Sequence, residues 1–196
     1  EGSALASTLA ISRRLLDTSV LAQLLHRSES VIYADLQSLQ DNGFVHYYHA
    51  TRQAELINVA LSDVIIGWLS ADEKTRVATQ LATWVEEREP DAHAELAYYY
   101  DIANTSAKVV IHAVEAARYF ESVYNNAQAL HYYRLSLSHE KDKTECDRLN
   151  RELAHLEIYL GHYDSAIAIL DDLIRCRRMI VDDYRFLGLA YTKKRE

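Results

Sequence analysis

The chain has 196 residues, of which 49% are hydrophobic, and this proportion allows a packed core and excludes a disordered chain. Its formal net charge of −8 excludes a general attraction to nucleic acid or acidic membranes. The low content of 5 Gly and 1 Pro favours helices over a fold made of many strands and turns.

The two cysteines and the absence of long apolar runs bear on location. Cys146 and Cys176 have neither Cys-x-x-Cys spacing nor histidines at metal-ligand spacing, so we expect free thiols in a reducing compartment. No apolar run approaches the roughly 18 residues that a membrane span requires. The first residues lack the basic and apolar regions of a signal peptide. We therefore predict a cytoplasmic protein without membrane contact.

Residues 5–58 predict a winged-helix-like module. Apolar residues at helical spacing predict a first helix, and Asp17 is placed to cap a second. A third helix begins at Ser28 or Ser30 and ends near Gly43, a residue that suits a left-handed cap. Two short apolar segments then predict a β-hairpin. Three helices followed by a hairpin are the order of a winged helix.

The predicted third helix bears on DNA binding. A DNA-reading helix carries cations and amides aimed at bases and phosphates. Residues 30–41 contain no Lys or Arg, and residues 1–50 carry three Arg against five acidic residues, a balance of −2. Phosphate attraction supplies most non-specific affinity, so we predict a packing or protein-contact module. The alternative is a DNA-binding transcriptional regulator that uses the winged helix directly.

Residues 59–93 predict a helical linker. The run from Leu56 to Leu69 is almost continuously apolar, and it predicts a largely buried helix. Ser70 and Glu73 have the spacing of a capping box and mark the start of the next helix, whose apolar residues share one face.

Residues 94–196 predict tetratricopeptide-like helical repeats. Ala154 and Gly188 are small residues that each follow a leucine, and 34 residues, the period of this repeat, separate them. Ala117 precedes Ala154 by 37 residues. We expect these small residues at close helix–helix contacts. The predicted helices are 107–124, 127–138, 144–160, 163–176 and 182–193. The last of these has no partner helix in the sequence, so we expect the chain to be a piece of a larger protein.

The order of these segments resembles the signal-transduction ATPases with numerous domains, such as maltose-activator-type regulators and ATPase-linked cyclases. The residues that carry the resemblance are Leu69-Ser70, Asp72-Glu73-Lys74, Glu95-Leu96-Ala97 and Tyr100. The resemblance covers nearly the whole chain, and it implies a regulatory region that follows a nucleotide-binding domain. The phosphate-binding motif of that domain, Gly-x-x-x-x-Gly-Lys-Ser/Thr, does not occur in this sequence. The predicted fold is therefore all-α, with a winged-helix-like module followed by an α-α superhelix of repeats.

In this repeat architecture the first helix of each pair lines a concave groove, where cationic residues gather. The predicted groove residues are Arg118, Arg148, Arg151, His155, Tyr159 and Arg185. Arginine binds carboxylates through a planar fork. We therefore predict a groove for an acidic peptide or protein partner, in which Arg148, Arg151 and Arg185 converge on a shared carboxylate. The alternative is a solvated face with salt bridges to Glu152, Asp182 or Asp183.

No catalytic, cofactor or metal site is predicted. His46 and His49 are the closest histidine pair, and a hairpin does not set residues at this spacing on one face. No nucleophile elbow or other catalytic context occurs. Several tyrosines, Tyr124 and Tyr133 among them, form either a stacking surface or part of the core and groove packing. We predict a non-enzymatic, protein-interacting and signal-sensing scaffold.

Overall fold

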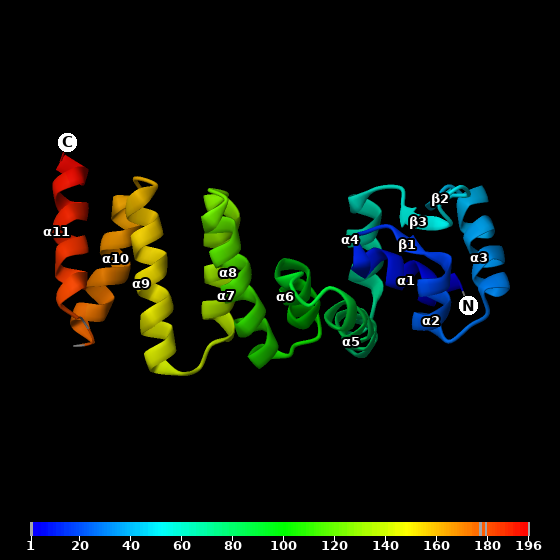
Figure 1. The fold of residues 1–196 in the computed structure, drawn as a ribbon, viewed down its shortest axis with the longest axis horizontal. Coiled ribbons are helices and arrows are strands. Elements are labelled where there is room, and N and C mark those ends of the chain that lie inside the picture. The colour runs from blue at the N-terminus through cyan, green and yellow to red at the C-terminus, as the bar shows by residue number, and fades with distance from the viewer. Residues whose placement is uncertain (1, 177, 179, 196) are drawn as a thin grey trace. The chain divides into compact units, whose positions relative to one another are not determined.

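The computed structural model describes residues 2–176, 178 and 180–195. Over these residues it contains eleven helices and one small three-stranded sheet, so the chain is all-α in class, as predicted (Figure 1). The chain divides into two compact units, and the boundary passes through helix α6 (His93–Ile102). The first unit comprises the residues up to Ala92 with Tyr98–Asn104, and the second comprises His93–Ala97 with the residues from Thr105 onward. None of the described helices has both the length and the apolar character needed to cross a membrane.

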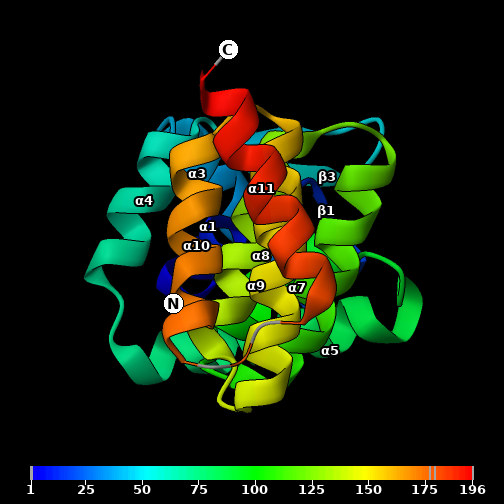
Figure 2. The same cartoon turned by 90° about the vertical axis from the view of Figure 1, so that its left-hand side faces the viewer.

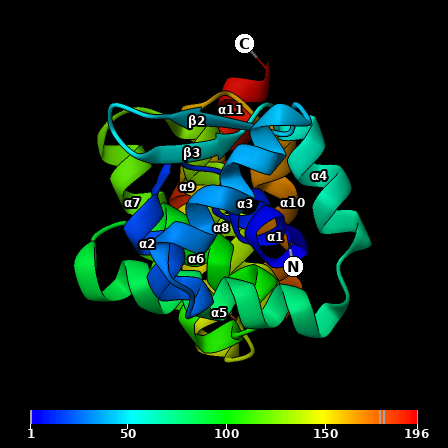
Figure 3. The ribbon, with the colours of Figure 1, turned by 90° about the vertical axis from the view of Figure 1, so that its right-hand side faces the viewer.

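The first unit combines helices with a small antiparallel sheet. Its elements are α1 (Gly2–Ser12), β1 (Leu16–Asp17), α2 (Thr18–Leu25), α3 (Glu29–Asp41), β2 (Val45–Tyr48), β3 (Gln53–Leu56), α4 (Val59–Trp68) and α5 (Ala71–Arg88). The sheet order is β1-β3-β2, with Leu16 opposite Ala54 and Val45 opposite Leu56. Figure 3 shows the β2–β3 hairpin beside α3. The hairpin is confirmed, whereas the two-residue strand β1 was not predicted.

Local capping signals are confirmed where side chains can satisfy free amides. The Asp17 carboxylate accepts a hydrogen bond from the Ser19 amide at 2.7 Å. Gly43 follows α3 with a φ of 74°, in the left-handed region. Ser70 and Glu73 form the predicted capping box, in which each backbone amide donates to the other side chain, at 3.0 and 3.3 Å. A single cap of this kind contributes about 1 kcal/mol.

Helix α4 contradicts the prediction of a largely buried helix. Val59 is 61% exposed and Trp68 is 81% exposed, and the one α4 residue that is buried is Ser62. The helix packs mainly against α1. A helix that packs on one neighbour buries one stripe of its surface, so a continuous apolar run leaves the remaining apolar residues exposed.

The second unit is built from successive helices. They are α7 (Ser106–Ser122), α8 (Asn126–His139), α9 (Lys143–Tyr159), α10 (Tyr163–Arg175) and α11 (Val181–Arg195). Each helix packs against the next, as α7 does on α8 and α9 on α10. Figure 2 shows α11 facing the viewer with α10 beside it. All five predicted helices are present at nearly the predicted bounds.

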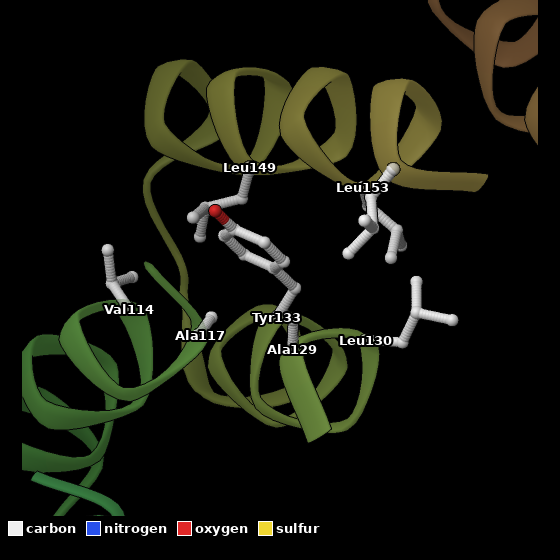
Figure 4. Close-up of a cluster of buried hydrophobic side chains, with 8 residues drawn as sticks. Val114, Ala117, Ala129, Leu130, Tyr133, Leu149 and Leu153 are labelled. Carbon is white, nitrogen blue, oxygen red and sulfur yellow. The ribbon is translucent and has the colours of Figure 1, made fainter. Parts of the chain in front are cut away.

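The interior between α7, α8 and α9 is an apolar cluster around Tyr133. Figure 4 shows Tyr133 reaching from α8 toward Leu149 and Leu153 of α9, with Ala117 of α7 nearby. Ala117 and Ala154 are fully buried in successive clusters. Small residues at these positions permit the close packing that the repeat spacing predicts.

Gly188 contradicts the prediction of a close helix contact. Its backbone is exposed, and a Cβ atom added there would meet no heavy atom within 4 Å. The buried small residue of α11 is instead Ala190, which packs with Ala154 and Leu170. Residues two apart point about 200° apart around a helix. The repeat spacing therefore predicted the position of α11 in the chain correctly, but it predicted the wrong face of α11 to pack against the neighbouring helices.

Candidate functional site

The predicted site residues lie on α7, α9 and α11 of the second unit, and we call the part of these helices that carries them the α7–α9–α11 surface. Its members are Arg118, Arg148, Arg151, His155, Tyr159 and Arg185. Three of its arginines pair with carboxylates of their own helices. The pairs are Arg118 with Glu115 at 2.8 Å, Arg148 with Glu145 at 2.9 Å and Arg185 with Asp182 at 3.2 Å. The positive charge of this surface is therefore balanced locally.

Arg151 differs from the other arginines because it joins two helices. Its Nε atom donates to both carboxylate oxygens of Asp183, at 3.0 and 2.9 Å, and a second nitrogen donates to the Arg178 carbonyl at 2.5 Å. The Asp183 carboxylate is buried and also accepts a hydrogen bond from the Ile180 amide at 2.9 Å. Arg151 therefore fastens α9 to the start of α11, as in the salt-bridged alternative.

The three arginines expected to converge do not share a carboxylate in the structure. Arg148 interacts with Glu145 and, at 3.8 Å, with Glu152. Arg151 holds Asp183, and Arg185 pairs with Asp182. An acidic partner would have to compete with these intramolecular carboxylates for each guanidinium group.

A second buried carboxylate, Glu157, was not singled out in the sequence. It accepts hydrogen bonds from Arg134 of α8 at 2.6 Å and from Ser165 of α10 at 3.0 Å, and its other oxygen lies 2.7 Å from Nδ1 of His162. Burying an ionised carboxylate is costly unless it is paired and hydrogen-bonded. Glu157 meets both conditions, so we assign it to the joint between α8, α9 and α10.

His155 packs its ring on Phe186 of α11, with the ring centroids 3.6 Å apart. Its Nε2 atom is buried and has no hydrogen-bond partner among the described residues. Burial lowers the pKa of His155, because it disfavours the charged form of the ring, while the carboxylates of Glu152 and Asp183 oppose that shift. At neutral pH the His155 ring is therefore uncharged and acts as an aromatic surface.

Tyr159 lies at an open pocket of about 440 Å³ near the carboxyl ends of α7 and α9. The residues that line this pocket are Glu121, Ser122, Tyr124, Asn126, His155, Leu156 and Tyr159. Tyr124 is 78% exposed and Tyr159 is 71% exposed. We call this site the Tyr124–Tyr159 pocket, and it holds two of the predicted groove residues but none of the predicted arginines.

Glu121 supplies the charge of this pocket. Its carboxylate accepts a hydrogen bond from the Tyr133 hydroxyl at 3.1 Å. Burial, helped by the Glu121 charge, raises the pKa of Tyr133, so the phenol remains a donor at neutral pH. Because Tyr133 is itself packed in the α7–α8–α9 cluster, this hydrogen bond positions the Glu121 side chain.

Tyr124 has a backbone conformation that the sequence analysis did not anticipate. Its φ is +58°, in the left-handed region, at the turn between α7 and α8. Gly161, with a φ of +80°, ends α9 in the same way 37 residues later, the offset that also relates Ala117 to Ala154. A left-handed conformation costs a non-glycine residue about 1–2 kcal/mol. Four other described non-glycine residues also have a positive φ, and the alignment of Tyr124 with Gly161 is the sequence signal that could have predicted it for Tyr124.

The other surface considered for function is α3 of the first unit. Arg27 precedes this helix and lies 2.8 Å from the Asp35 carboxylate, and Arg52 from the β2–β3 turn pairs with Glu29. Both arginines are thus neutralised by carboxylates of α3 itself. Its described residues include no Lys or Arg, so this helix offers no cation to a DNA phosphate.

A scan against protein-family models, a search of curated proteins and a search of solved structures each found no match to the chain. The function must therefore be inferred from the chemistry of the residues themselves. The Tyr124–Tyr159 pocket is the main basis for that inference.

Proposed function

We propose that the chain is a protein-interaction and signal-sensing scaffold, formed by a winged-helix-like module and tetratricopeptide-like repeats. In this proposal it is a regulatory part of a larger multidomain signalling ATPase, as its resemblance to the signal-transduction ATPases with numerous domains implies. The three helices followed by a hairpin in the first unit support the first module. The helix pairs with buried alanines 37 residues apart support the repeats.

The observation that carries the proposal is the exposure of Tyr124 and Tyr159 at one pocket. Tyrosine offers a large, rigid contact area with one polar end, and it is enriched at protein interfaces and their energetic centres. The predicted arginines are held in intramolecular ion pairs, such as Arg118 with Glu115. A partner segment therefore meets aromatic rings rather than a field of unpaired arginines.

The partner class in this proposal is a protein segment that binds to the α7–α9–α11 surface. The acidic peptide expected from the sequence remains one form of it, although each arginine there already has a carboxylate of this chain. Glu145, Asp182 and Asp183 already bind the guanidinium groups of Arg148, Arg185 and Arg151. An acidic segment binds these arginines only if its carboxylates displace those of this chain. A selection in which peptide charge is free to vary tests the class without presupposing its sign.

The experiment is a phage-display selection of random dodecapeptides on the immobilised chain, repeated on Tyr159→Ala. We expect a family of related peptides that binds the original chain and is lost from the variant, because truncating an interface tyrosine removes a central contact. Circular dichroism of both proteins controls for folding. If no related family emerges, or if the same peptides bind Tyr159→Ala equally well, the proposed function is wrong.

A further inference from the structure

We propose that the Tyr124–Tyr159 pocket binds a basic side chain, Lys or Arg, of a partner peptide. This inference deepens the proposed function and rests on it, and it reverses the sign of charge that the arginine-rich sequence predicts for the partner. It draws on four features of the pocket: its charge, its helix ends, its aromatic walls and the conformation of one wall residue.

The charge of the pocket is negative. Among the described residues that line it, Glu121 is charged and none is Lys or Arg. The carboxylates that act on the His155 ring in the pocket wall are Glu152, Asp183, Asp182 and Glu121. The arginine of α7, Arg118, is paired with Glu115 at 2.8 Å. Arg148, Arg151 and Arg185 pair with Glu152, Asp183 and Asp182, so Glu121 is the carboxylate that a cation entering the pocket meets.

Three helix ends lie around the pocket, two carboxyl ends and one amino end. Helix α7 ends at Ser122 and α9 ends at Tyr159, so both bring their carboxyl ends to this site, while α8 begins at Asn126 and brings its amino end. The carboxyl end of a helix carries a partial negative charge from its unsatisfied carbonyl groups. The amino end of α8 carries the opposite partial charge, but two carboxyl ends and the Glu121 carboxylate outweigh it, so the balance favours a cationic group.

The aromatic walls suit a cation that carries an apolar stem. Tyr124 and Tyr159 are both mostly exposed, and the faces of tyrosine rings attract ammonium and guanidinium groups. Leu156 and the uncharged ring of His155 provide apolar contacts deeper in the wall. Lysine and arginine combine a hydrocarbon stem with a charged end, which matches these two parts of the pocket.

The conformation of Tyr124 is a separate indication that its ring is needed. The turn that ends α7 holds Tyr124 at a φ of +58°, while the matching turn after α9 uses Gly161. Two backbone hydrogen bonds hold this turn, because the Tyr124 amide donates to the Glu121 carbonyl at 3.0 Å and the Asn125 amide donates to the Phe120 carbonyl at 2.8 Å. Strained residues of this kind cluster at binding and catalytic sites. Four other described non-glycine residues also have a positive φ, so it is this conformation together with the exposed ring at the pocket that assigns Tyr124 to ligand contact.

The test uses the peptides from the phage-display selection, each labelled with fluorescein and measured by fluorescence anisotropy. We expect the selected family to share a Lys or Arg, and its replacement by Ala to weaken binding on the order of tenfold. Binding should also weaken as sodium chloride is added, because salt screens the attraction. Tyr124→Gly and Glu121→Gln should each weaken binding of the same peptide, while Tyr119→Ala should not.

These variants separate loss of a contact from loss of fold. Tyr119 is an exposed tyrosine of α7 outside the residues that line the pocket, so Tyr119→Ala is the matched control. Tyr124→Gly should raise the thermal midpoint while it lowers affinity, a combination that a purely structural role does not produce. A selected family that shares an acidic residue, or whose basic residue is replaced without effect, overturns this inference and leaves the proposed function standing. If the selection yields no family of related peptides, both this inference and the proposed function are wrong.

Discussion

The ion pair of Arg151 with Asp183, which joins α9 to α11, leads to the largest predicted change in the free energy of unfolding. Arg151→Met keeps much of the apolar stem but removes the hydrogen bonds to Asp183 and to the Arg178 carbonyl. The Asp183 carboxylate then stays buried with the Ile180 amide as its remaining donor among the described residues. Removing one partner of a buried ion pair costs roughly 3–5 kcal/mol. Because Arg151 itself is partly exposed, we expect about 3 kcal/mol, at the lower end of that range.

The assay is urea unfolding of the original chain, Arg151→Met, Asp183→Leu and the double variant. In this cycle the double variant should regain part of the stability lost by Arg151→Met, because it removes the unpaired carboxylate as well. Arg185→Met is the matched control, since Arg185 lies 34 residues later, is 79% exposed and pairs within its own helix. It should change stability by less than about 0.5 kcal/mol. A loss below about 1 kcal/mol for Arg151→Met would refute the reasoning.

Three further predictions follow from the structure. Gly188→Ala should raise the thermal midpoint through a gain of about 0.5–1 kcal/mol, because its site is open and helical, and a lower midpoint would show that this face is packed. Tyr124→Gly should stabilise the chain by about 1 kcal/mol in urea unfolding, and destabilisation would show that the ring serves the fold. The chain should give no band shift with duplex DNA at low salt, because Arg27 and Arg52 are paired with carboxylates of α3, and sub-micromolar binding at physiological salt would favour the DNA-binding alternative.

The elements that the sequence predicted correctly depend on short-range chemistry. Asp17 caps α2 two residues away, and Ser70 and Glu73 cap α5 within a single turn. Gly43 supplies the left-handed residue that ends α3. Such signals involve neighbours in the chain, so they can be recognised without knowledge of the tertiary contacts. The burial of Ala117 and Ala154 was predicted differently, from a spacing that recurs along the sequence and can also be recognised without knowledge of the tertiary contacts.

The predictions that were wrong concern which face of a helix packs against a neighbour. The apolar run of α4 has no polar stripe to mark its exposed side, so its composition indicated burial that the packing on α1 does not provide. Gly188 matches Ala154 in spacing, yet α11 turns Ala190 inward. The spacing of apolar residues predicts where a helix lies in the sequence, but its packing against neighbouring helices determines which face is buried.

The candidate site shows the same division. Arg118, Arg148 and Arg185 were placed on the correct helices, but their pairing with Glu115, Glu145 and Asp182 depends on side-chain geometry that a count of charges does not reveal. In the sequence Tyr124 is one tyrosine among 14. Its left-handed backbone and its alignment with Gly161 distinguish it only when the turn geometry is known.

Hydrogen–deuterium exchange of the chain, with and without a peptide obtained in the phage-display selection, tests the central claim most directly. The account predicts slower exchange at the carboxyl ends of α7 and α9, around Tyr124 and Tyr159, with unchanged exchange in α3. Protection confined to α3, or spread over helices that contribute nothing to the Tyr124–Tyr159 pocket, would contradict it.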